Sequence, residues 1–331
     1  MPDKPTAEPV LVTEGVWGEA FEELAARHDV RRLADPRSDL DALSRASALV
    51  VRNRTRVDAE LLAAAPRLRI VGRAGVGLDN IDLRAADEAG VVVSAALGAN
   101  AVSVAEHTVL LALALLRDLR THDRAVRRGQ WRRTPGRELS GRTWGLLGAG
   151  ATGRAVARLL AGFGVTMIAH DPFVARDDEL IRTLRIEMVS LDDLIARSDV
   201  LSVHLPATDE TRGLIDADLL ARIPPGAILI NVGRGEVVDE SALAEALRDG
   251  RPAGAGLDVR AEEPPGPGPL DGLDQVLFTP HVAGITGESQ QRIAAVLAAD
   301  VAAVLRGDRA SAAVGRHATA PHRTEVSHED R

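Results

Sequence analysis

The stretch WGLLGAGATGRAVARLL, residues 144–160, is the part of the sequence from which the fold is most directly inferred. It begins with an apolar run that predicts a short buried strand, and it ends with an alanine- and leucine-rich run that predicts a helix. Between the two runs, Gly148, Gly150 and Gly153 follow the spacing G-x-G-x-x-G. A strand, a glycine-rich turn and a helix in this order are typical of the first unit of a parallel α/β sheet.

Each glycine of this motif has its own physical role. The first permits a tight turn, the second lets a pyrophosphate approach the backbone, and the third lets the helix pack closely on the strand. The helix N-terminus then offers free N–H groups and a positive dipole end to the anion. The motif alone is a weak signal, but the strand before it and the helix after it are the context that confirms it. We therefore predict that a dinucleotide contacts Gly148, Gly150, Ala151, Thr152 and Gly153.

A carboxylate follows at the distance that dinucleotide binding requires. The run 165–169 predicts a second strand, and Asp171 comes shortly after it, about 20 residues beyond the motif. An aspartate there accepts hydrogen bonds from the ribose hydroxyls and repels a 2′-phosphate, so the predicted cofactor is NAD rather than NADP. The alternative is that Asp171-Pro172 is merely a turn that ends the strand.

Outward from this motif, short β-branched runs alternate with helical stretches along most of the chain. This order predicts an α/β fold of two lobes, each a Rossmann-like doubly wound parallel sheet. Strands are expected at 10–13, 48–51, 68–72 and 90–94, and within the later runs GVTMIAHD, DVLSVHLP, AILINVG, AGAGLDV and VLFTPH.

The longest helices and the lobe boundaries complete this outline. Helices are expected over 19–27, over 103–120, where Ser103 and Glu106 form a capping box, and over about 288–305. We expect the second block to be inserted into the first, with the last helix returning to the first lobe. The remaining residues, 311–331, have no apolar period, and we expect them to form a disordered tail.

Composition limits the possible functions. The 331 residues suit about two domains, and a net charge of −8 argues against a general nucleic-acid-binding surface. The chain has no cysteine, which excludes disulfides, thiolate metal sites and cysteine nucleophiles and is compatible with a reducing compartment. With no signal-peptide pattern and no apolar run long enough to span a bilayer, the protein is expected to be cytoplasmic and not bound to membranes. No metal site is predicted, because the tail histidines His317, His322 and His328 are more typical of a solvated segment.

Strand ends of the second block supply candidates for chemistry. Arg234 lies between two glycines just after a buried strand, where its guanidinium suits a carboxylate or an adjacent carbonyl. His281, in TPHVAG, follows another strand end, and the glutamates at 262 and 263 follow a third. A histidine paired with a carboxylate can take a proton from a hydroxyl while hydride leaves the same carbon. Composition alone does not choose among the other histidines, which are His107 early in a helix, His170 before Asp171, and His204 after a strand.

Taken together, these segments resemble the D-isomer-specific 2-hydroxyacid dehydrogenases, and most closely the D-3-phosphoglycerate dehydrogenase branch. The resemblance covers roughly residues 10–306 and rests on GRAGVGLDNID, NAVSVAEHT, GLLGAGATG, VHLP, INVGRGEVVDESALAEAL, AGLDVRAEEP and TPHVAG, in that order. It implies a catalytic set of Arg234, Glu263 and His281, since Glu263 is the glutamate immediately before the proline. It also implies that a nucleotide lobe, residues 99–284, is inserted into a flavodoxin-like substrate lobe formed by residues 1–98 and 285–310, and that a homodimer forms through the nucleotide lobes.

The resemblance implies further contacts on both lobes. The cofactor residues it adds to the glycine loop and Asp171 are His204, Pro206, Thr211, Val232, Gly233, Asp258 and Gly284. The substrate, a small anionic 2-hydroxy or 2-keto acid, is expected at Arg52, Arg73, Ala74, Gly75, Val76 and Asn100, with the N–H groups of 74–76 holding its carboxylate. Arg52, with Arg54 and Arg56 nearby, suits a phosphorylated or dianionic substrate such as 3-phosphoglycerate. The alternative for Arg54 and Arg56 is a solvated charged loop.

Some departures from the family pattern leave other functions open. Ala151-Thr152 stands where members usually carry Arg-Ile, which removes one cationic phosphate contact, and the regulatory C-terminal domains of many phosphoglycerate dehydrogenases are not seen in this sequence. The nearest enzymatic alternative is a glyoxylate or hydroxypyruvate reductase. Others are an NAD-sensing interaction protein like the C-terminal-binding corepressors, or an enzyme of the same family that oxidises formate or phosphite.

Overall fold

The computed structural model describes residues 9–16 and 18–317, and it divides the chain into two units. The outer unit is formed by residues up to Asn100 together with those from Gly287 onward. The inserted unit is formed by Ala101–Thr286. None of the helices in the described part of the chain is long and apolar enough to cross a membrane.

The outer unit is built on a six-stranded sheet in the order β13-β5-β4-β3-β1-β2. The first five strands of the chain pair in parallel, and their order 2-1-3-4-5 is that of flavodoxin-like sheets. These strands alternate with helices along the chain, as the sequence predicted. The elements are β1 (Val10–Thr13), α1 (Glu19–Arg27), β2 (Val30–Leu33), the 3-10 turn η1 (Pro36–Ser38), α2 (Leu40–Arg45), β3 (Ala48–Val51), α3 (Ala59–Ala64), β4 (Ile70–Arg73), α4 (Leu83–Glu88), β5 (Val92–Ala95), α12 (Gly287–Arg306), β13 (Ala313–Val314) and the 3-10 turn η3 (Gly315–His317).

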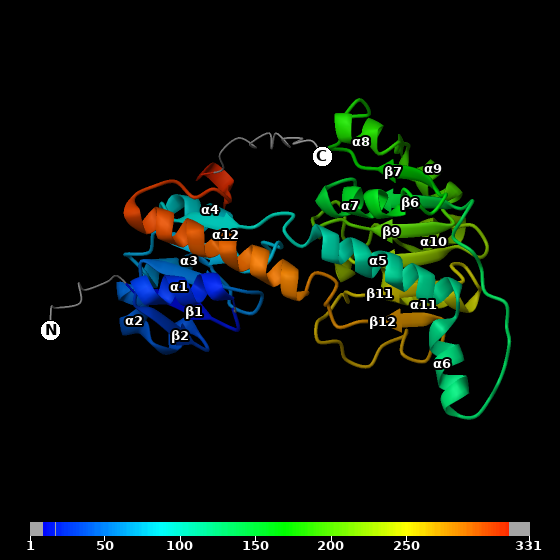
Figure 1. The fold of residues 1–331 in the computed structure, drawn as a ribbon, viewed down its shortest axis with the longest axis horizontal. Helices are drawn as coiled ribbons and strands as arrows, with labels where there is room; N and C mark the ends of the chain where they lie inside the picture. Colours follow the sequence, from blue (N-terminus) through cyan, green and yellow to red (C-terminus); the bar gives the residue numbers. More distant parts are fainter. Residues whose placement is uncertain (1–8, 17, 318–331) are drawn as a thin grey trace, which may run out of the picture. The chain divides into compact units, whose positions relative to one another are not determined.

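Helices cover both faces of this sheet because its strands are apolar on both sides. In β1, Val10 and Val12 pack with α1 and α12, while Leu11 between them packs with the opposite layer of α2, α3 and α4. Figure 1 shows α12 running alongside α1, and the two helices are in contact. Each helix of the opposite layer starts at an aspartate whose side chain accepts a backbone N–H, namely Asp39, Asp58 and Asp82.

The expectation of a disordered tail from residue 311 is wrong for residues 311–317. Ala313 and Val314 form β13, which pairs antiparallel with β5. The buried carboxylate of Asp300 on α12 holds this strand, because it accepts hydrogen bonds from Ser94 Oγ (2.6 Å), Ser311 N (2.7 Å), Ser311 Oγ (2.8 Å) and Ala312 N (2.9 Å). One buried aspartate therefore orders a segment whose own composition predicts disorder. The rest of the predicted tail lies outside the described residues.

The inserted unit is built on a seven-stranded sheet in the order β12-β11-β10-β9-β6-β7-β8. All pairs are parallel, and numbering its strands from β6 gives the order 3-2-1-4-5-6-7, the Rossmann order with one more strand. The predicted fold class, two doubly wound α/β lobes, is confirmed. The elements are α5 (Ala101–Leu116), α6 (Leu119–Arg127), β6 (Thr143–Leu147), α7 (Ala151–Leu160), β7 (Thr166–His170), α8 (Glu179–Thr183), β8 (Glu187–Met188), α9 (Leu191–Arg197), β9 (Val200–Val203), α10 (Ala217–Arg222), β10 (Ile228–Asn231), the 3-10 turn η2 (Gly235–Val237), α11 (Glu240–Arg248), β11 (Gly254–Leu257) and β12 (Val276–Phe278).

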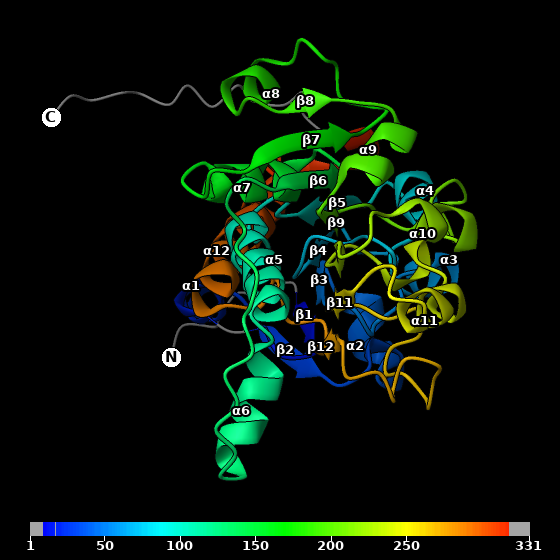
Figure 2. The same ribbon diagram turned by 90° about the vertical axis from the view of Figure 1, so that its right-hand side faces the viewer.

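The helix predicted over 103–120 differs from the observed one at both ends. It begins at Ala101, so Ser103 lies inside α5 and is not its N-cap; the Ser103 hydroxyl instead hydrogen-bonds the hydroxyl of Thr286 at 2.9 Å. The helix stops at Leu116, and Asp118 takes a left-handed conformation with φ of 46° before α6 starts. As a result α6 changes direction, has no buried residue and projects from the unit (Figure 2).

Candidate active site

The glycine loop joins β6 to α7 in the conformation that the sequence predicted. Gly148 has a φ of +103°, which side chains rarely adopt, and a Cβ on Gly153 would lie 2.3 Å from the carbonyl oxygen of Gly148. A Cβ on Gly150 would meet nothing within 4 Å, so this glycine borders open space. Gly150 is also the N-cap of α7 and offers no side-chain cap, which leaves the first N–H groups of the helix available to an anion.

Asp171 is attached to this loop. Its Oδ2 accepts the N–H of Ala149 at 2.9 Å, and its Oδ1 accepts the N–H of Phe173 at 2.9 Å. Each carboxylate oxygen has a second lone pair, so both can still accept a hydrogen bond from a hydroxyl group. Asp171 therefore stands at the carboxyl end of β7, beside the glycine loop, where a dinucleotide ribose is bound in folds of this type.

His204 lies against the same loop, at the end of β9. Its backbone carbonyl group would be 3.1 Å from a Cβ on Gly148, and its Nε2 lies 2.9 Å from Ser202 Oγ. Burial lowers the pKa of His204 to about 4, so the ring is neutral at pH 7. Its Nδ1 is buried without a hydrogen-bond partner in the described chain. A buried polar atom without a partner, beside an open glycine loop, fits a site whose remaining partner is a ligand.

The other predicted cofactor residues of the inserted unit lie at neighbouring strand ends. Thr211 closes the loop after β9 by donating to the carbonyl oxygen of Pro206 at 2.7 Å. Gly233, after β10, packs against that loop, since a Cβ there would be 2.7 Å from the carbonyl oxygen of Leu205. The residues at these strand ends are Pro206, Thr211, Val232, Gly233, Asp258 and Gly284.

The predicted acid–base pair is formed. Nδ1 of His281 lies 2.7 Å from Oε2 of Glu263, and Oε1 of Glu263 accepts the N–H of Arg260 at 3.1 Å. Burial raises the pKa of Glu263, but the hydrogen bonds from His281 and Arg260 outweigh it, and the pKa lies below its usual value. The positive charge of Arg234 acts on Glu263 in the same direction. Glu263 therefore interacts with both His281 and Arg234.

Close packing of two loops explains why Arg234 is near this pair. A Cβ on Gly235 would lie 1.9 Å from the carbonyl carbon of Arg260, so the backbone of the arginine loop rests directly on the loop that carries Glu263. The guanidinium of Arg234 donates to the carbonyl oxygen of Gly233 at 2.8 Å. Only glycine at 235 permits this approach.

Glu240 is a functional residue that the sequence analysis missed. It begins α11, and its carboxylate binds the guanidinium of Arg260 through two bonds of 2.9 and 2.8 Å and accepts the N–H of Ala261 at 3.0 Å. The hydrogen bond from Arg260 lowers the pKa of Glu240. Glu240 therefore holds the loop from which Glu263 reaches His281. The segment EVVDESALAEAL contains this glutamate, but no sequence pattern connects it with a loop 20 residues further on.

In the outer unit, the predicted substrate arginines lie on a loop fixed by two polar side chains. Glu14 accepts the N–H groups of Arg52, Arg54 and Thr55 at 3.1 to 3.2 Å, and these bonds lower its pKa although burial acts the other way. Asn80 donates to the carbonyl oxygens of Arg52 and Thr55 at 2.8 and 2.6 Å. Arg54 is 81% exposed and forms an ion pair with Glu14 at 3.5 Å.

The expectation that the N–H groups of residues 74–76 are free donors is wrong for two of the three. The N–H of Ala74 donates to the carbonyl oxygen of Val51 at 2.7 Å, and that of Gly75 donates to the carbonyl oxygen of Arg73 at 2.8 Å in a three-residue turn. Among the described residues, the N–H of Val76 has no partner. The guanidinium of Arg73 lies over Gly75, since a Cβ there would be 1.5 Å from Nη1 of Arg73.

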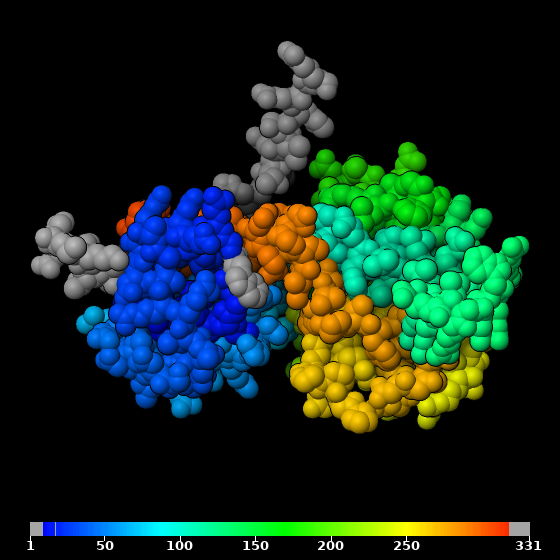
Figure 3. All heavy atoms as spheres, turned by 60° about the horizontal axis from the view of Figure 1, so that its bottom comes forward, coloured from blue at the N-terminus to red at the C-terminus, as the bar shows by residue number. Residues whose placement is uncertain are grey.

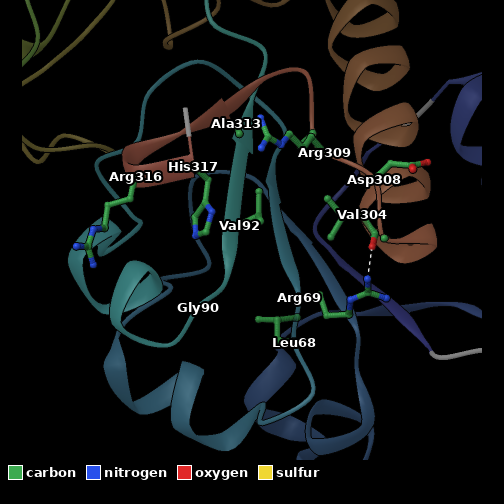
Figure 4. A pocket seen from close by; sticks show the side chains of 12 residues that line it. Leu68, Arg69, Gly90, Val92, Val304, Asp308, Arg309, Ala313, Arg316 and His317 are labelled. Carbon is green, nitrogen blue, oxygen red and sulfur yellow. Dashed lines mark hydrogen bonds between the residues drawn. The ribbon is translucent and has the colours of Figure 1, made fainter. Parts of the chain in front are cut away.

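The outer unit also has a buried amide oxygen without a partner in the described chain and a hollow on its surface. The Oδ1 of Asn100 is buried without a partner in the described chain, as expected of a residue that awaits a ligand. A hollow of about 720 Å³ on the outer unit lies between the end of α12 and β13 and contains none of the predicted site residues (Figure 4). At its edge Arg69 donates to the carbonyl oxygens of Val304 and Leu305 and so caps α12.

In the part of the chain described, no group of three or more histidine or acidic residues is placed to hold a metal ion.

Comparison with known proteins adds to this geometry. The family model for the D-isomer specific 2-hydroxyacid dehydrogenase, NAD binding domain, matches residues 109–283. The D-3-phosphoglycerate dehydrogenase of Mycobacterium tuberculosis is 45% identical over 303 residues, which are 90% of this chain and 57% of that protein. This chain therefore spans little more than half the length of that relative.

Two other proteins are similar over most of their length. The (S)-sulfolactate dehydrogenase of Chromohalobacter salexigens is 46% identical over 249 residues, 74% of this chain and 80% of that protein. The crystal structure of the D-lactate dehydrogenase of Aquifex aeolicus, complexed with NAD and lactic acid, matches with a TM-score of 0.81 at 30% identity. That match covers 90% of this chain and 96% of the other.

Proposed function

The chain belongs to the D-isomer-specific 2-hydroxyacid dehydrogenase family, and we propose that it is an NAD-dependent oxidoreductase that interconverts a D-2-hydroxy acid and its 2-keto acid. The observation that carries this proposal is the 2.7 Å contact between His281 and Glu263, with the charge of Arg234 acting on the same pair. When bound, NAD supplies or accepts the hydride.

His281 is the proposed general acid and base. Its Nδ1 is occupied by Glu263, which leaves Nε2 as the nitrogen that exchanges a proton with the substrate hydroxyl. In the oxidation direction, Nε2 takes the hydroxyl proton as the carbon loses hydride, and the ionised Glu263 stabilises the resulting imidazolium. In the reduction direction the same nitrogen returns the proton to the forming alkoxide.

Arg234 is the proposed clamp on the substrate carboxylate. A guanidinium forms two parallel hydrogen bonds with a carboxylate, and its charge also polarises a neighbouring carbonyl group. Its position between two glycines, against the loop that carries Glu263, supports this role. In the outer unit we assign binding of the substrate to the N–H of Val76 and the guanidinium of Arg73. The N–H groups of Ala74 and Gly75 are left out because they donate to main-chain oxygens.

The glycine loop, the first turn of α7 and Asp171 are the residues that would hold NAD. Their fit rests on the open space at Gly150, the uncapped helix terminus and the buried, unpartnered Nδ1 of His204. A carboxylate at 171 disfavours a 2′-phosphate, which supports NAD over NADP. Ala151 stands where family members usually carry an arginine, and the neighbouring Thr152 can donate one neutral hydrogen bond to a phosphate.

An anionic substrate, 3-phosphoglycerate or a similar acid, is the proposed substrate class. Arg52 and Arg54 lie on one ordered loop, and two relatives are named for substrates with an additional phosphate or sulfonate group. Arg54 is 81% exposed, whereas the guanidinium of Arg52 is held in place by the main-chain oxygen of Gly15 at 3.0 Å, so Arg52 is the residue to which we assign the second anionic group. A cytoplasmic location also stays a proposal, for which the absence of cysteine is the compatible observation.

A homodimer formed through the inserted units is the proposed assembly. The segment that contains α6 lies in the blue-green part of the surface in Figure 3. On α6 and the segment after it, Leu119 (56%), Val126 (53%) and Trp131 (75%) are exposed. Exposed apolar side chains of this size mark interaction surfaces. Light scattering of the wild type and of Val126→Glu tests this assembly.

Oxidation of NADH by the purified protein across a panel of 2-keto acids tests the activity. The panel contains 3-phosphohydroxypyruvate, sulfopyruvate, hydroxypyruvate, glyoxylate and pyruvate. Preference for the first two supports the role of Arg52, and we expect Arg52→Gln to remove that preference while turnover of glyoxylate persists. Preference for the small acids indicates a glyoxylate or hydroxypyruvate reductase. NADH binding without any turnover points to a nucleotide-sensing protein.

A further inference from the structure

A chain of hydrogen bonds connects α5 to the loop that carries His281. Nε2 of His107 on α5 lies 3.0 Å from Oγ1 of Thr279, and Oγ1 of Thr279 donates to Oδ1 of Asp258 at 2.6 Å. The side chain of Asp258 is fully buried and that of His107 is 16% exposed. None of the three side chains takes part in the proton or carboxylate chemistry proposed above.

The direction of each bond follows from the number of protons available. Asp258 accepts the N–H of Val282 at Oδ1 (2.9 Å) and that of Ala283 at Oδ2 (2.8 Å), so its carboxylate acts as an acceptor. A threonine hydroxyl has one proton, which is used in the short bond to Asp258. The oxygen of Thr279 must therefore accept from His107, which fixes a proton on Nε2 of His107.

These bonds hold a strained segment in place. His281 has a φ of 54°, a left-handed conformation that costs a non-glycine residue about 1 kcal/mol or more. Its N–H donates to the main-chain oxygen of Asp258 at 2.7 Å. Asp258 thus binds the loop at positions 279, 281, 282 and 283 through its side chain and main chain together.

We propose that His107 and Thr279 are positioning residues that set the orientation of His281 through Asp258. The inference rests on the proposed dehydrogenase function and deepens it, because it names what holds the acid–base residue in place. His107 donates to the hydroxyl oxygen of Thr279 and thereby keeps the hydroxyl proton directed at Asp258. The loop then presents the imidazole to Glu263 in one conformation.

Substitution of Thr279 tests the proposal, with a matched pair of variants. Thr279→Val keeps the shape and removes the hydroxyl, whereas Thr279→Ser keeps the hydroxyl. We expect Thr279→Val to lower kcat by about 10- to 100-fold, the scale for a displaced catalytic group, with the NADH Kd within about twofold of wild type. Thr279→Ser should retain most of kcat. A purely structural role would instead lower the free energy of unfolding and the fraction of active protein without changing kcat per active site.

Nuclear magnetic resonance of ¹⁵N-labelled histidine gives a readout that is independent of turnover. The wild type and Thr279→Ser should show His107 with its proton on Nε2, and Thr279→Val should show a mixture of tautomers. His107→Gln, which can still donate to Thr279, and His107→Leu, which cannot, form a second pair in case Thr279→Val does not fold. We expect kcat to survive in the first and to fall in the second.

The outcomes separate this inference from the proposed function. Wild-type kcat in both Thr279→Val and His107→Leu, or a proton on Nδ1 of His107 in the wild type, would overturn the inference while the dehydrogenase activity stands. A wild-type protein that binds NADH but reduces no 2-keto acid would overturn the proposed function, and the tautomer of His107 would still report whether the hydrogen-bond chain exists.

Discussion

Nδ1 of His281 lies 2.7 Å from Oε2 of Glu263, although the two residues are 18 positions apart in the sequence. They meet because they follow β11 and β12, which are neighbouring parallel strands whose carboxyl ends lie at the same edge of the sheet. The contact leaves Nε2 of His281 for the substrate and gives the ring a fixed partner.

Removal of the imidazole is the most direct test of this pair. We expect His281→Gln to lower kcat by about 10²- to 10⁴-fold, the range that general acid–base catalysis supplies. NADH binding, measured by fluorescence, should stay within about twofold of wild type, since the glycine loop and Asp171 are unchanged. Glu263→Gln should also lower kcat, because it removes the negative charge that stabilises the imidazolium. Unchanged turnover in His281→Gln would exclude this residue as the acid–base group.

Much of the fold could be predicted from the sequence because its signals are local. The strand at 10–13 and the helix at 19–27 have the predicted bounds, and the glycine loop lies between strand and helix as expected. The residues predicted to be catalytic, Arg234, Glu263 and His281, also interact, because strand ends of a parallel sheet share one edge.

The parts that the sequence did not predict depend on contacts between distant residues. Asp300 orders β13 from another element, and Glu240 holds the loop of Glu263 across 20 residues. The amides of Ala74 and Gly75 are used within the chain, which only the three-dimensional turn reveals. Ser103 has the pattern of a capping box, yet the helix starts before it, at Ala101, and the serine hydroxyl hydrogen-bonds Thr286.

Two glycines of the phosphate loop should respond differently to the same substitution. Gly153→Ala places a Cβ 2.3 Å from the carbonyl oxygen of Gly148, so we expect it to lower the free energy of unfolding by about 1–3 kcal/mol. Gly150→Ala meets nothing within 4 Å in the protein itself and should cost less than about 1 kcal/mol. We nevertheless expect Gly150→Ala to raise the NADH Kd about tenfold or more, because the added methyl group enters the space for the pyrophosphate. Urea unfolding and fluorescence titration measure the two effects, and wild-type affinity in Gly150→Ala would contradict the proposed position of the cofactor.

Cofactor preference should depend on Asp171. Asp171→Ser keeps a group that can accept from the N–H of Ala149 and removes the charge that repels a 2′-phosphate. We expect the ratio of kcat/KM for NADH over NADPH to fall about tenfold or more, a change of about 1.4 kcal/mol in relative transition-state binding. Asp177→Ser, on the loop before α8, serves as a control for the loss of one negative charge. An equal ratio in wild type and Asp171→Ser would mean that another residue selects the cofactor.

Gly75 should be required for the position of Arg73. A Cβ at residue 75 would lie 1.5 Å from Nη1 and 2.7 Å from Cζ of Arg73, so Gly75→Ala must move the guanidinium. We expect KM for the 2-keto acid to rise about tenfold or more, while NADH affinity and the free energy of unfolding change little. Gly162→Ala, where a Cβ meets nothing within 4 Å, is the matched control. An unchanged KM in Gly75→Ala would remove Arg73 from substrate binding.

The buried imidazole of His204 should make stability depend on pH. Its pKa is about 4 in the folded protein against an ordinary 6.5, so between these values the unfolded chain binds more protons than the folded one. The free energy of unfolding therefore decreases as the pH falls from about 6.5 to about 4, by up to about 3 kcal/mol from this residue alone. His204→Gln removes this contribution. The free energy of unfolding of the wild type minus that of the variant should therefore be constant above about pH 7 and should decrease below pH 6. Urea unfolding of both proteins at a series of pH values measures it. Parallel curves across the whole range would mean that His204 is accessible to protons in the folded state, and its unpartnered Nδ1 would then not be a buried polar atom kept for the cofactor.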